Sequence, residues 1–307
     1  MEFNHISVLL QESVDALNIK PDGVYVDCTA GGGGHSAEIL SHLNENGKMY
    51  LFDRDPDAIS VLTEKFKGDE RVTIIHDNYS NIKFCLEALD VFKVDGIVAD
   101  LGVSSFQLDT AERGFSFHND ALLDMRMSKT GLSAKDVVNT YSENELCRII
   151  TNYGEEKFAK KIASNIVKAR EKQEITTTFQ LSDIISDSIP AKFKRDGHPA
   201  RKTFQAIRIE VNNELDGLKD VLPDMFGLLN KDGVLAIITF HSLEDKIVKD
   251  YFATLKQGCT CPKDFPVCVC GKTPKAIVKS GGVKAGKKEL DNNKRSRSAK
   301  LRTALKI

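Results

Sequence analysis

Apolar positions in the first hundred residues fall into four short runs separated by helical patterns. The runs cover residues 23–28, 48–53, 71–76 and 96–101. The segments between them, at 36–43, 57–66 and 81–89, have the apolar spacing of amphipathic helices. Buried strands that alternate with such helices predict a mostly parallel sheet with helices wound on both faces. The sequence therefore predicts a doubly wound, Rossmann-like α/β fold.

This alternation stops after the fourth run. Residues 109–211 show helical patterns but no strand of comparable strength, and an apolar run at 234–240 then resumes the strand pattern. The final stretch, 298–306, alternates like a strand with one exposed face. We therefore predict an inserted helical domain, 109–211, within a sheet domain formed by 1–108 plus 212–307.

Composition places the chain among globular enzymes. Of its 307 residues, 41% are hydrophobic and 28% are charged. No apolar run approaches the roughly 20 residues that span a bilayer. The first residues also lack the basic-then-apolar layout of a signal peptide. We expect a cytoplasmic protein with no membrane partner.

The overall net charge of −1 conceals a basic C-terminal segment. Residues 256–307 hold 14 Lys and Arg against three Asp and Glu, a net charge of +11, so the rest of the chain carries −12. Such a segment is typical of polyanion binding, but a solvated tail has the same composition. Charge alone leaves both interpretations open. The part of this segment from Gly258 to about Asn293 is rich in Gly and Lys and is expected to be a loop.

Four consecutive glycines, residues 31–34, follow the first predicted strand. Without Cβ atoms the backbone can lie close against a ligand, and the helix that follows offers unpaired N–H groups and the positive end of its dipole. A dinucleotide motif requires Gly-x-Gly-x-x-Gly, but its last position is Ser36 or Ala37 here. Asp27 precedes the glycines and suits a cofactor that carries an ammonium group. The loop therefore favours S-adenosylmethionine over a dinucleotide.

Further candidates follow the other strands. Asp53 ends the second strand, where a carboxylate can accept both ribose hydroxyls of an adenosine; the surrounding acidic residues also suit a helix start. Tyr79 follows the third strand and can pack on an adenine, or it is an ordinary half-buried aromatic residue. Asp100, followed by Ser104, ends the fourth strand, where a methyl acceptor is expected. Ser104 is alternatively a cap for the next turn.

Ten motifs in order resemble the RsmH (MraW) family of 16S ribosomal RNA cytosine-N4 methyltransferases, nearly from end to end. The motifs are His5-x-x-Val8-Leu9-Leu10, Gly32-Gly33-Gly34-His35, Asp53-Arg54-Asp55, Asp100-Leu101-Gly102-Val103-Ser104-Ser105, Glu112-Arg113-Gly114-Phe115-Ser116-Phe117, Leu123-Asp124-Met125-Arg126-Met127, Tyr153-Gly154-Glu155-Glu156, His198-Pro199-Ala200-Arg201-x-Thr203-Phe204-Gln205, Phe240-His241-Ser242-Leu243-Glu244-Asp245 and Arg297-Ser298-Ala299-Lys300-Leu301-Arg302.

The resemblance implies a class I methyltransferase that methylates the exocyclic N4 of a cytidine in the decoding region of 16S ribosomal RNA, within the small ribosomal subunit, with the insert recognising substrate. It implies cofactor contacts at Gly33, Gly34, His35, Asp53, Tyr79, Asp100 and Gln107. The chemistry suggests that Asp100 and Ser104 accept hydrogen bonds from the amine and that His241 takes a proton, although His241 also suits a helix start. Methylation of another nucleic-acid amino group and a non-catalytic RNA-binding assembly factor remain alternatives.

Two sets of residues are weaker candidates. Family-matching segments of the insert offer RNA contacts at Arg113, His198, Arg201 and Lys202. Four thiols at Cys259, Cys261, Cys268 and Cys270 are enough for a tetrahedral zinc site, but one residue within each pair is less than zinc motifs usually have. The sequence therefore does not favour a metal, and a loop without metal or with redox-active cysteines is the alternative.

Overall fold

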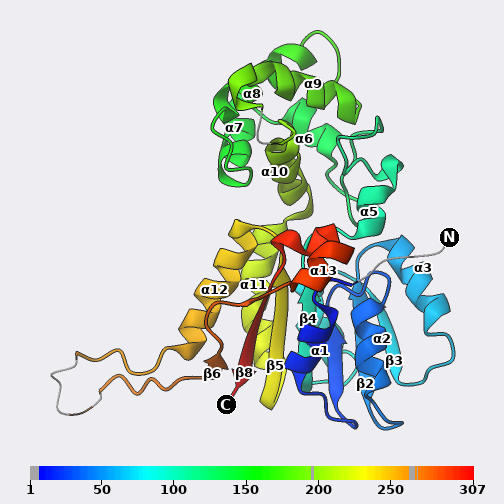
Figure 1. The fold of residues 1–307 in the computed structure, drawn as a ribbon, viewed down its shortest axis with the longest axis vertical. Helices are drawn as coiled ribbons and strands as arrows, with labels where there is room; N and C mark the ends of the chain where they lie inside the picture. Colours follow the sequence, from blue (N-terminus) through cyan, green and yellow to red (C-terminus); the bar gives the residue numbers. More distant parts are fainter. Residues whose placement is uncertain (1–6, 195–196, 263–266, 268) are drawn as a thin grey trace. The chain divides into compact units, whose positions relative to one another are not determined.

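The computed structural model describes residues 7–194, 197–262, 267 and 269–307 and divides the chain into two compact units (Figure 1). Unit 1 comprises Met1–Gly102 and Leu215–Ile307, and unit 2 comprises Val103–Glu214. The divisions lie close to the predicted positions 109 and 211. The first falls earlier because the short helix α5 (Ser105–Asp109) belongs to unit 2.

Unit 1 is built on one sheet in the order β3-β2-β1-β4-β5-β8-β6, with β7 paired to β8. The strands are β1 (Val24–Asp27), β2 (Lys48–Asp53), β3 (Val72–His76), β4 (Val94–Asp100), β5 (Leu229–Thr239), β6 (Ala276–Val278), β7 (Val283–Lys284) and β8 (Lys300–Lys306). The first five strands are mutually parallel, whereas β8 runs antiparallel to both β5 and β6. The mostly parallel sheet predicted from the apolar runs is confirmed.

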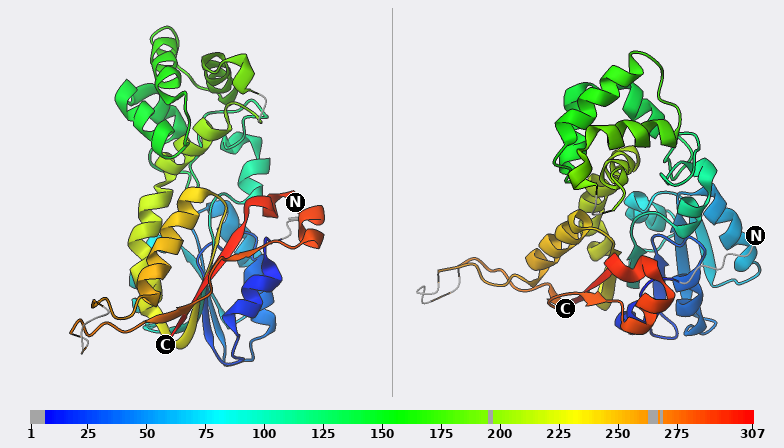
Figure 2. Two further views of the ribbon diagram at one scale, coloured as in Figure 1. Left: turned by 60° about the vertical axis from the view of Figure 1, so that its left-hand side comes forward. Right: turned by 45° about the horizontal axis from the view of Figure 1, so that its top comes forward.

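Helices cover both faces of this sheet (Figure 2). They are α1 (Leu10–Leu17), α2 (Gly34–Ser41), α3 (Pro56–Lys65), η1 (Tyr79–Asn81), α4 (Ile82–Glu87), α11 (Glu214–Leu228), α12 (Ser242–Lys256), α13 (Lys287–Asn292) and η4 (Lys294–Ser298). Neighbouring strand residues point to opposite faces. Val26 and Ile97 join the core under α4, α11 and α12, while Tyr25 and Val98 join the core under α1, α2 and α3. The sheet is therefore doubly wound.

The C-terminal segment differs from the prediction in two ways. The expected loop contains β6, β7 and α13. In β8, Arg302 is only 8% exposed because its guanidinium bonds Asp245 on α12 at 2.6 and 3.0 Å, and Lys300 contacts the same carboxylate at 2.9 Å. Because β8 lies between two strands and under α12, its polar side chains pair internally instead of forming a wholly exposed face.

Unit 2 is a helical assembly around its own apolar core. Its helices are α5, η2 (Ala111–Arg113), α6 (Ala134–Thr140), α7 (Glu143–Asn152), α8 (Ala159–Arg170), α9 (Thr178–Ser188), η3 (Ala191–Phe193) and α10 (Arg201–Asn212). Serine or threonine begins four of them, α5, α6, α7 and α9, in reciprocal capping boxes. Within the described parts of the chain, no helix is long and apolar enough to cross a membrane.

Candidate functional site

Three aspartates end neighbouring strands of unit 1. Asp27 ends β1, Asp53 ends β2 and Asp100 ends β4, and β1 lies between β2 and β4 in the sheet. Because these strands are parallel, their carboxyl ends share one edge of the sheet, where ligands of such folds bind. The topology thus brings together acidic residues from distant parts of the sequence, since Asp27 and Asp100 are 73 positions apart.

Asp27 is the most enclosed of the three, with 1% of the residue exposed. Its Oδ2 accepts a hydrogen bond from Ser36 Oγ at 2.6 Å and its Oδ1 accepts one from the Thr29 N–H at 3.1 Å. Burial raises the pKa of this carboxyl to about 6, although both hydrogen bonds favour the ionised form. Both of these hydrogen-bond donors are neutral, which favours a positively charged ligand near this carboxylate.

Asp53 ties the glycine loop to the second strand. Its Oδ2 accepts from the Gly31 N–H and its Oδ1 from the Asp55 N–H, each at 2.8 Å. Burial of the carboxyl group raises its pKa to about 6. The helix α3 is capped by Asp55, whose side chain accepts from the Asp57 N–H at 3.1 Å. Because Asp55 and not Asp53 caps α3, the Asp53 carboxylate contacts the glycine loop instead.

Asp100 has an unusual environment. Its N–H donates to Thr29 Oγ1 at 2.6 Å, but its Oδ1 is buried and has no hydrogen-bond partner among the described residues. Burial, and then the charges of Asp27 and Glu244, raise its pKa well above the usual range. An unpartnered buried acceptor beside two other carboxylates is costly. Such an arrangement persists where a ligand supplies the missing donor or positive charge.

The glycine loop has the backbone conformation expected of a ligand cradle. Gly31 has φ 51° and Gly33, the N-cap residue of α2, has φ 68°, both in the left-handed region that favours glycine. A Cβ at Gly34 would overlap Ser7 Oγ. Lys65 Nζ donates to the carbonyls of Gly32 and Gly33 at 2.9 and 2.7 Å and holds the loop in place.

His35 lies in the first turn of α2, but its ring is turned into the protein. The residue is buried, and Nε2 lies 3.1 Å from the Val8 carbonyl oxygen, which can only accept a hydrogen bond. Burial lowers the pKa of the ring to about 4, so it is neutral with its proton on Nε2. The ring is thus engaged with Val8, and the backbone N–H of His35 belongs to the first turn of α2.

The remaining cofactor candidates lie on two different units. Tyr79 begins η1 directly after β3 and packs, half-buried, against the core. Gln107 belongs to unit 2, where its Oε1 accepts from the Ser104 N–H at 3.0 Å and its N–H donates to Ser104 Oγ at 3.2 Å. This capping box gives Ser104 the structural role of starting α5.

His241 is the N-cap residue of α12. Its Nδ1 accepts from the Glu244 N–H at 3.5 Å, and its Nε2 lies 3.1 Å from Glu244 Oε1 without meeting hydrogen-bond geometry. Glu244 in turn accepts from the N–H groups of Phe240 and His241 at 2.8 and 3.3 Å. Both ring nitrogens therefore face Glu244, which supports the helix-start interpretation of His241.

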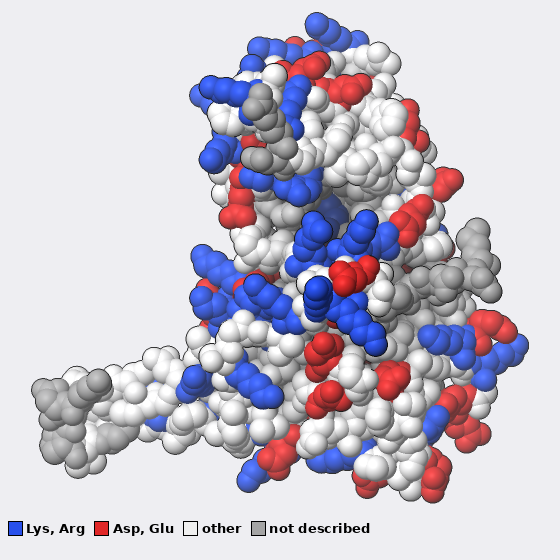
Figure 3. Space-filling view, viewed as in Figure 1, with Lys and Arg blue, Asp and Glu red and all other residues white. Residues whose placement is uncertain are grey.

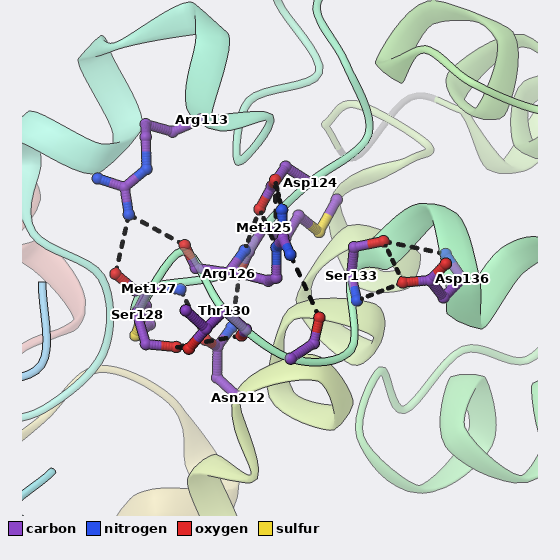
Figure 4. A network of polar contacts seen from close by, with 11 residues as sticks. Arg113, Asp124, Met125, Arg126, Met127, Ser128, Thr130, Ser133, Asp136 and Asn212 are labelled. Atoms are coloured by element: carbon purple, nitrogen blue, oxygen red, sulfur yellow. Dashed lines mark hydrogen bonds and ion pairs between the residues drawn. The ribbon is translucent and has the colours of Figure 1, made fainter.

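Arg113 has an internal role in unit 2 (Figure 4). It is 7% exposed, and its Nη2 donates to the carbonyls of Arg126 and Met127 at 2.9 Å each. Asn212 holds the same segment by donating to Met125 O and accepting from the Met127 N–H. The predicted RNA contact at Arg113 conflicts with this burial, because a guanidinium used on two carbonyls beneath the surface does not face a phosphate.

The other RNA candidates are accessible. His198 is exposed and stacks on Phe117, with ring centroids 4.3 Å apart and an angle of 16° between planes. Arg201 is exposed at the start of α10, and Lys202 donates to Glu155 O at 2.9 Å. Lys and Arg gather over α8 in unit 2 and over α12 and α13 in unit 1 (Figure 3). His198 and Arg201 therefore combine an aromatic face with a cation.

Three of the four candidate cysteines lie in the described part of the chain. Cys259, Cys261 and Cys270 bring their sulfur atoms within 4.8 Å of one another. Cys268 lies outside the described residues, as does His5 of the first motif.

Sequence similarity over the whole chain decides its family. The model of the MraW methylase family matches residues 2–307. The chain belongs to this family. It is 57% identical over 309 residues, covering 100% of both chains, to the Ribosomal RNA small subunit methyltransferase H of Clostridium botulinum strain Kyoto. It is 54% identical to the protein of the same name from Lachnospira eligens, over 100% of this chain and 99% of that one.

The family identifies the protein as a methyltransferase that uses S-adenosylmethionine, as predicted from the glycine loop and the resemblance. The chain also aligns with a solved rRNA methylase from Streptococcus thermophilus, with a TM-score of 0.43 and 11% identity over 99% of both chains.

Sequence reasoning missed several residues that shape the site. Lys65 closes the glycine loop from the last turn of α3, and no local pattern marks it. Thr29 anchors Asp100 through its hydroxyl, which depends on β1 and β4 being neighbours. Glu244 was detectable, since His241-x-x-Glu244 has the spacing of a capping box.

Proposed function

We propose that this protein transfers a methyl group from S-adenosylmethionine to the exocyclic N4 of a cytidine in the decoding region of 16S ribosomal RNA. Membership of the MraW methylases and near-complete alignment with small-subunit rRNA methyltransferases support the reaction class and the RNA. The resemblance of the motifs described above supports the base and its position. The small ribosomal subunit, or a precursor of it, is the proposed partner.

The observation that carries the proposal is the buried, unpartnered Oδ1 of Asp100 among the described residues. The charges of Asp27 and Glu244 both oppose its ionisation. A ligand with a sulfonium and an ammonium group reduces that repulsion, and an amine acceptor supplies the hydrogen-bond donor that Oδ1 needs. The positive charge of the cofactor and the N–H donor of the acceptor amine therefore both suit Asp100 Oδ1 and its surroundings.

The cofactor residues follow from the same edge of the sheet. The N–H groups of Gly34 and His35 at the start of α2 suit the carboxylate of a methionine moiety. Gly33 stays in the proposed set through its left-handed turn, because its own N–H donates to Ala30 O at 2.7 Å. Asp53 suits the ribose hydroxyls and Tyr79 the adenine, while Gln107 stays in the proposed set on the resemblance alone. When bound, S-adenosylmethionine supplies an electrophilic methyl group on a positively charged sulfur.

The acceptor nitrogen of cytosine is a poor nucleophile because its lone pair is delocalised into the ring. An acceptor on its N–H group favours the pyramidal geometry in which the lone pair is available, which stabilises the transition state relative to the ground state. We assign this role to Asp100 Oδ1. A carboxyl with a raised pKa can also hold the departing proton at that atom.

Ser104 and His241 keep secondary roles in the proposal. The Ser104 hydroxyl accepts from the Gln107 N–H with one of its two lone pairs, and we assign the other to accepting from the amine beside Asp100. His241 faces Glu244 with both ring nitrogens, so we assign it to positioning Glu244. Glu244 then acts on the pKa of Asp100 through its charge.

RNA recognition in unit 2 is proposed for His198, Arg201 and Lys202. The exposed His198 ring, already stacked on Phe117, offers a face on which an unpaired base can stack. Arg201 and Lys202 can contact phosphates, which fixes position without reading sequence. Arg113 is left out of this set because it is buried.

The reaction is tested by incubating the protein with labelled S-adenosylmethionine and, separately, free 16S RNA, assembled small subunits and DNA. The modified nucleoside is then identified. Labelled N4-methylcytidine in an RNA substrate is expected. Its absence from every RNA substrate, or label only in DNA, would overturn the proposal.

The site is tested with Asp100→Asn, which keeps the size of the side chain. Loss of the acceptor is expected to lower kcat by about 100-fold, typical for a group that acts on the transition state. Asp95→Asn is the matched control, because Asp95 lies on the same strand and pairs with Lys20. Equal kcat for Asp100→Asn and Asp95→Asn would remove Asp100 from the reaction.

A further inference from the structure

The segment between α12 and β6 leaves unit 1 as a projection with two limbs (Figure 1). Its base is fixed in the fold, since the Lys275 N–H donates to Leu255 O at 2.7 Å and Ala276 is buried in β6. Farther out, Val267 and Val269 are 70% and 74% exposed. These apolar side chains therefore form no core that holds the limbs together.

Cysteine sulfurs meet where the two limbs approach. Cys259 and Cys261 lie on the outgoing limb and Cys270 on the returning limb, and their Sγ atoms are all within 4.8 Å of one another. Cys270 Sγ lies 3.7 Å from Cys259 Sγ. A disulfide joins sulfurs at about 2.05 Å. Tetrahedral zinc with bonds of about 2.3 Å places its sulfur ligands about 3.8 Å apart. The observed separation corresponds to an edge of that tetrahedron.

Backbone N–H groups also point at these sulfurs. The Thr260 N–H, on the outgoing limb, donates to Cys270 Sγ at 3.4 Å, and the Val269 N–H, on the returning limb, donates to Cys261 Sγ at 3.3 Å. Donors of this kind stabilise negative charge on sulfur, which is the form that binds metal. Each limb thus supports a ligand of the other.

We propose that Cys259, Cys261 and Cys270 bind a zinc ion, or another divalent ion that prefers sulfur, and that the ion fastens the two limbs. Three thiolates give the ion three of its four positions. Each thiol loses one proton on binding, so the affinity increases with pH. The bound ion joins the limbs in a region where the described apolar side chains, Val267 and Val269, are exposed.

The test begins with metal analysis of the full chain purified with a reducing agent and zinc in the medium. About one zinc per chain is expected for the wild type and for the control Cys85→Ser, whose sulfur lies on α4 away from the cluster. Cys261→Ser is expected to lose at least ten-fold in zinc affinity. Zinc absent from the wild type, or equally retained by Cys261→Ser and Cys85→Ser, would overturn the proposal.

A second measurement does not depend on how well a variant folds. Addition of Co²⁺ to metal-free wild-type protein is expected to produce the near-ultraviolet charge-transfer band of cobalt bound by thiolates. Chelation of zinc is expected to speed tryptic cleavage after Lys272 on the returning limb, but not after Lys275, whose neighbour Ala276 is buried at the base. Absence of the cobalt band from reduced protein, or a Cys259–Cys270 disulfide in protein that binds no metal, would contradict the site.

Discussion

Replacement of Asp27 by asparagine separates the stability of unit 1 from cofactor binding. The change keeps the shape of the side chain, and the amide oxygen can still accept from the Thr29 N–H. The amide NH₂ can donate to Ser36 Oγ, whose hydroxyl then accepts instead of donating. The substitution therefore removes a buried charge with little loss of hydrogen bonding.

The expected gain in stability follows from the pKa. Burial raises the pKa of Asp27 from 3.8 to about 6, a shift of about two units, each equivalent to about 1.4 kcal/mol. A raised pKa means that ionisation is unfavourable in the folded state. This cost is absent below about pH 4, grows between about pH 4 and 6, and is complete at neutral pH. Asp27→Asn is thus expected to raise the free energy of unfolding by up to about 3 kcal/mol at pH 7.

The assay is urea unfolding of cofactor-free protein followed by circular dichroism, because the chain has no Trp. Asp95→Asn is a control of opposite sign. Burial acts to raise the pKa of Asp95, but hydrogen bonds from the Val24 N–H and the Lys20 ammonium together hold it below its usual value. That variant is therefore expected to lose stability at neutral pH.

Cofactor binding is expected to change in the other direction. Loss of the Asp27 charge removes attraction for a cationic ligand, so the Kd of S-adenosylmethionine should rise about ten-fold at pH 7, as measured by calorimetry. If the stability difference between Asp27→Asn and wild type is the same at about pH 4 and pH 7, Asp27 does not carry the buried charge that this reasoning requires.

Three further predictions concern stability and RNA binding. Gly33→Ala should destabilise the protein by at least about 2 kcal/mol in thermal unfolding, because φ is 68° and the new Cβ would lie 2.8 Å from a ring carbon of Phe66. Gly68→Ala, where φ is 82° but the space is open, should cost about 1 kcal/mol. Equal losses of stability in the two variants would exclude steric contact as the cause. Arg302→Ala should cost about 2 kcal/mol in urea unfolding, because Arg302 is buried and makes two hydrogen bonds to the partly exposed Asp245 carboxylate. Lys300→Ala should cost less, because Lys300 is more exposed and makes one; the reverse order would refute this account. Arg113→Ala should lower the stability of unit 2 but leave the salt dependence of RNA binding unchanged, and a slope reduced by about one would restore Arg113 as a phosphate contact.

The RNA proposal has its own test in unit 2. His198→Ala is expected to weaken RNA binding by about ten-fold, and His198→Phe to restore most of it, because stacking needs an aromatic face and not an imidazole. Lys67→Ala, an exposed lysine of unit 1, is the matched control and should change binding only slightly. Equal binding by all three variants in filter-binding titrations would remove His198 from the RNA surface.

The sequence by itself predicted the helical insert, the glycine loop and the strands β1 to β5 and β8, but it missed β6 and β7. These features depend on local rules: apolar runs bury both faces of parallel strands, and left-handed backbone at residues 31 and 33 requires glycine. The family motifs indicated the reaction class, methyl transfer, because their residues stand at fixed positions in the MraW methylase family. Capping boxes such as Ser142 with Glu145 were also readable, since both partners lie within one turn.

Only the tertiary structure showed which of these residues lie close to one another in the folded protein. Asp27 and Asp100 interact because β1 and β4 are neighbours, although 73 positions separate them. The Arg113 side chain is buried in unit 2, and the buried His35 ring contacts the Val8 carbonyl. The sulfur atoms of Cys259, Cys261 and Cys270 lie within 4.8 Å of one another, which their spacing in the sequence does not reveal. Contacts between distant segments depend on topology and packing, and local residue patterns carry little information about either.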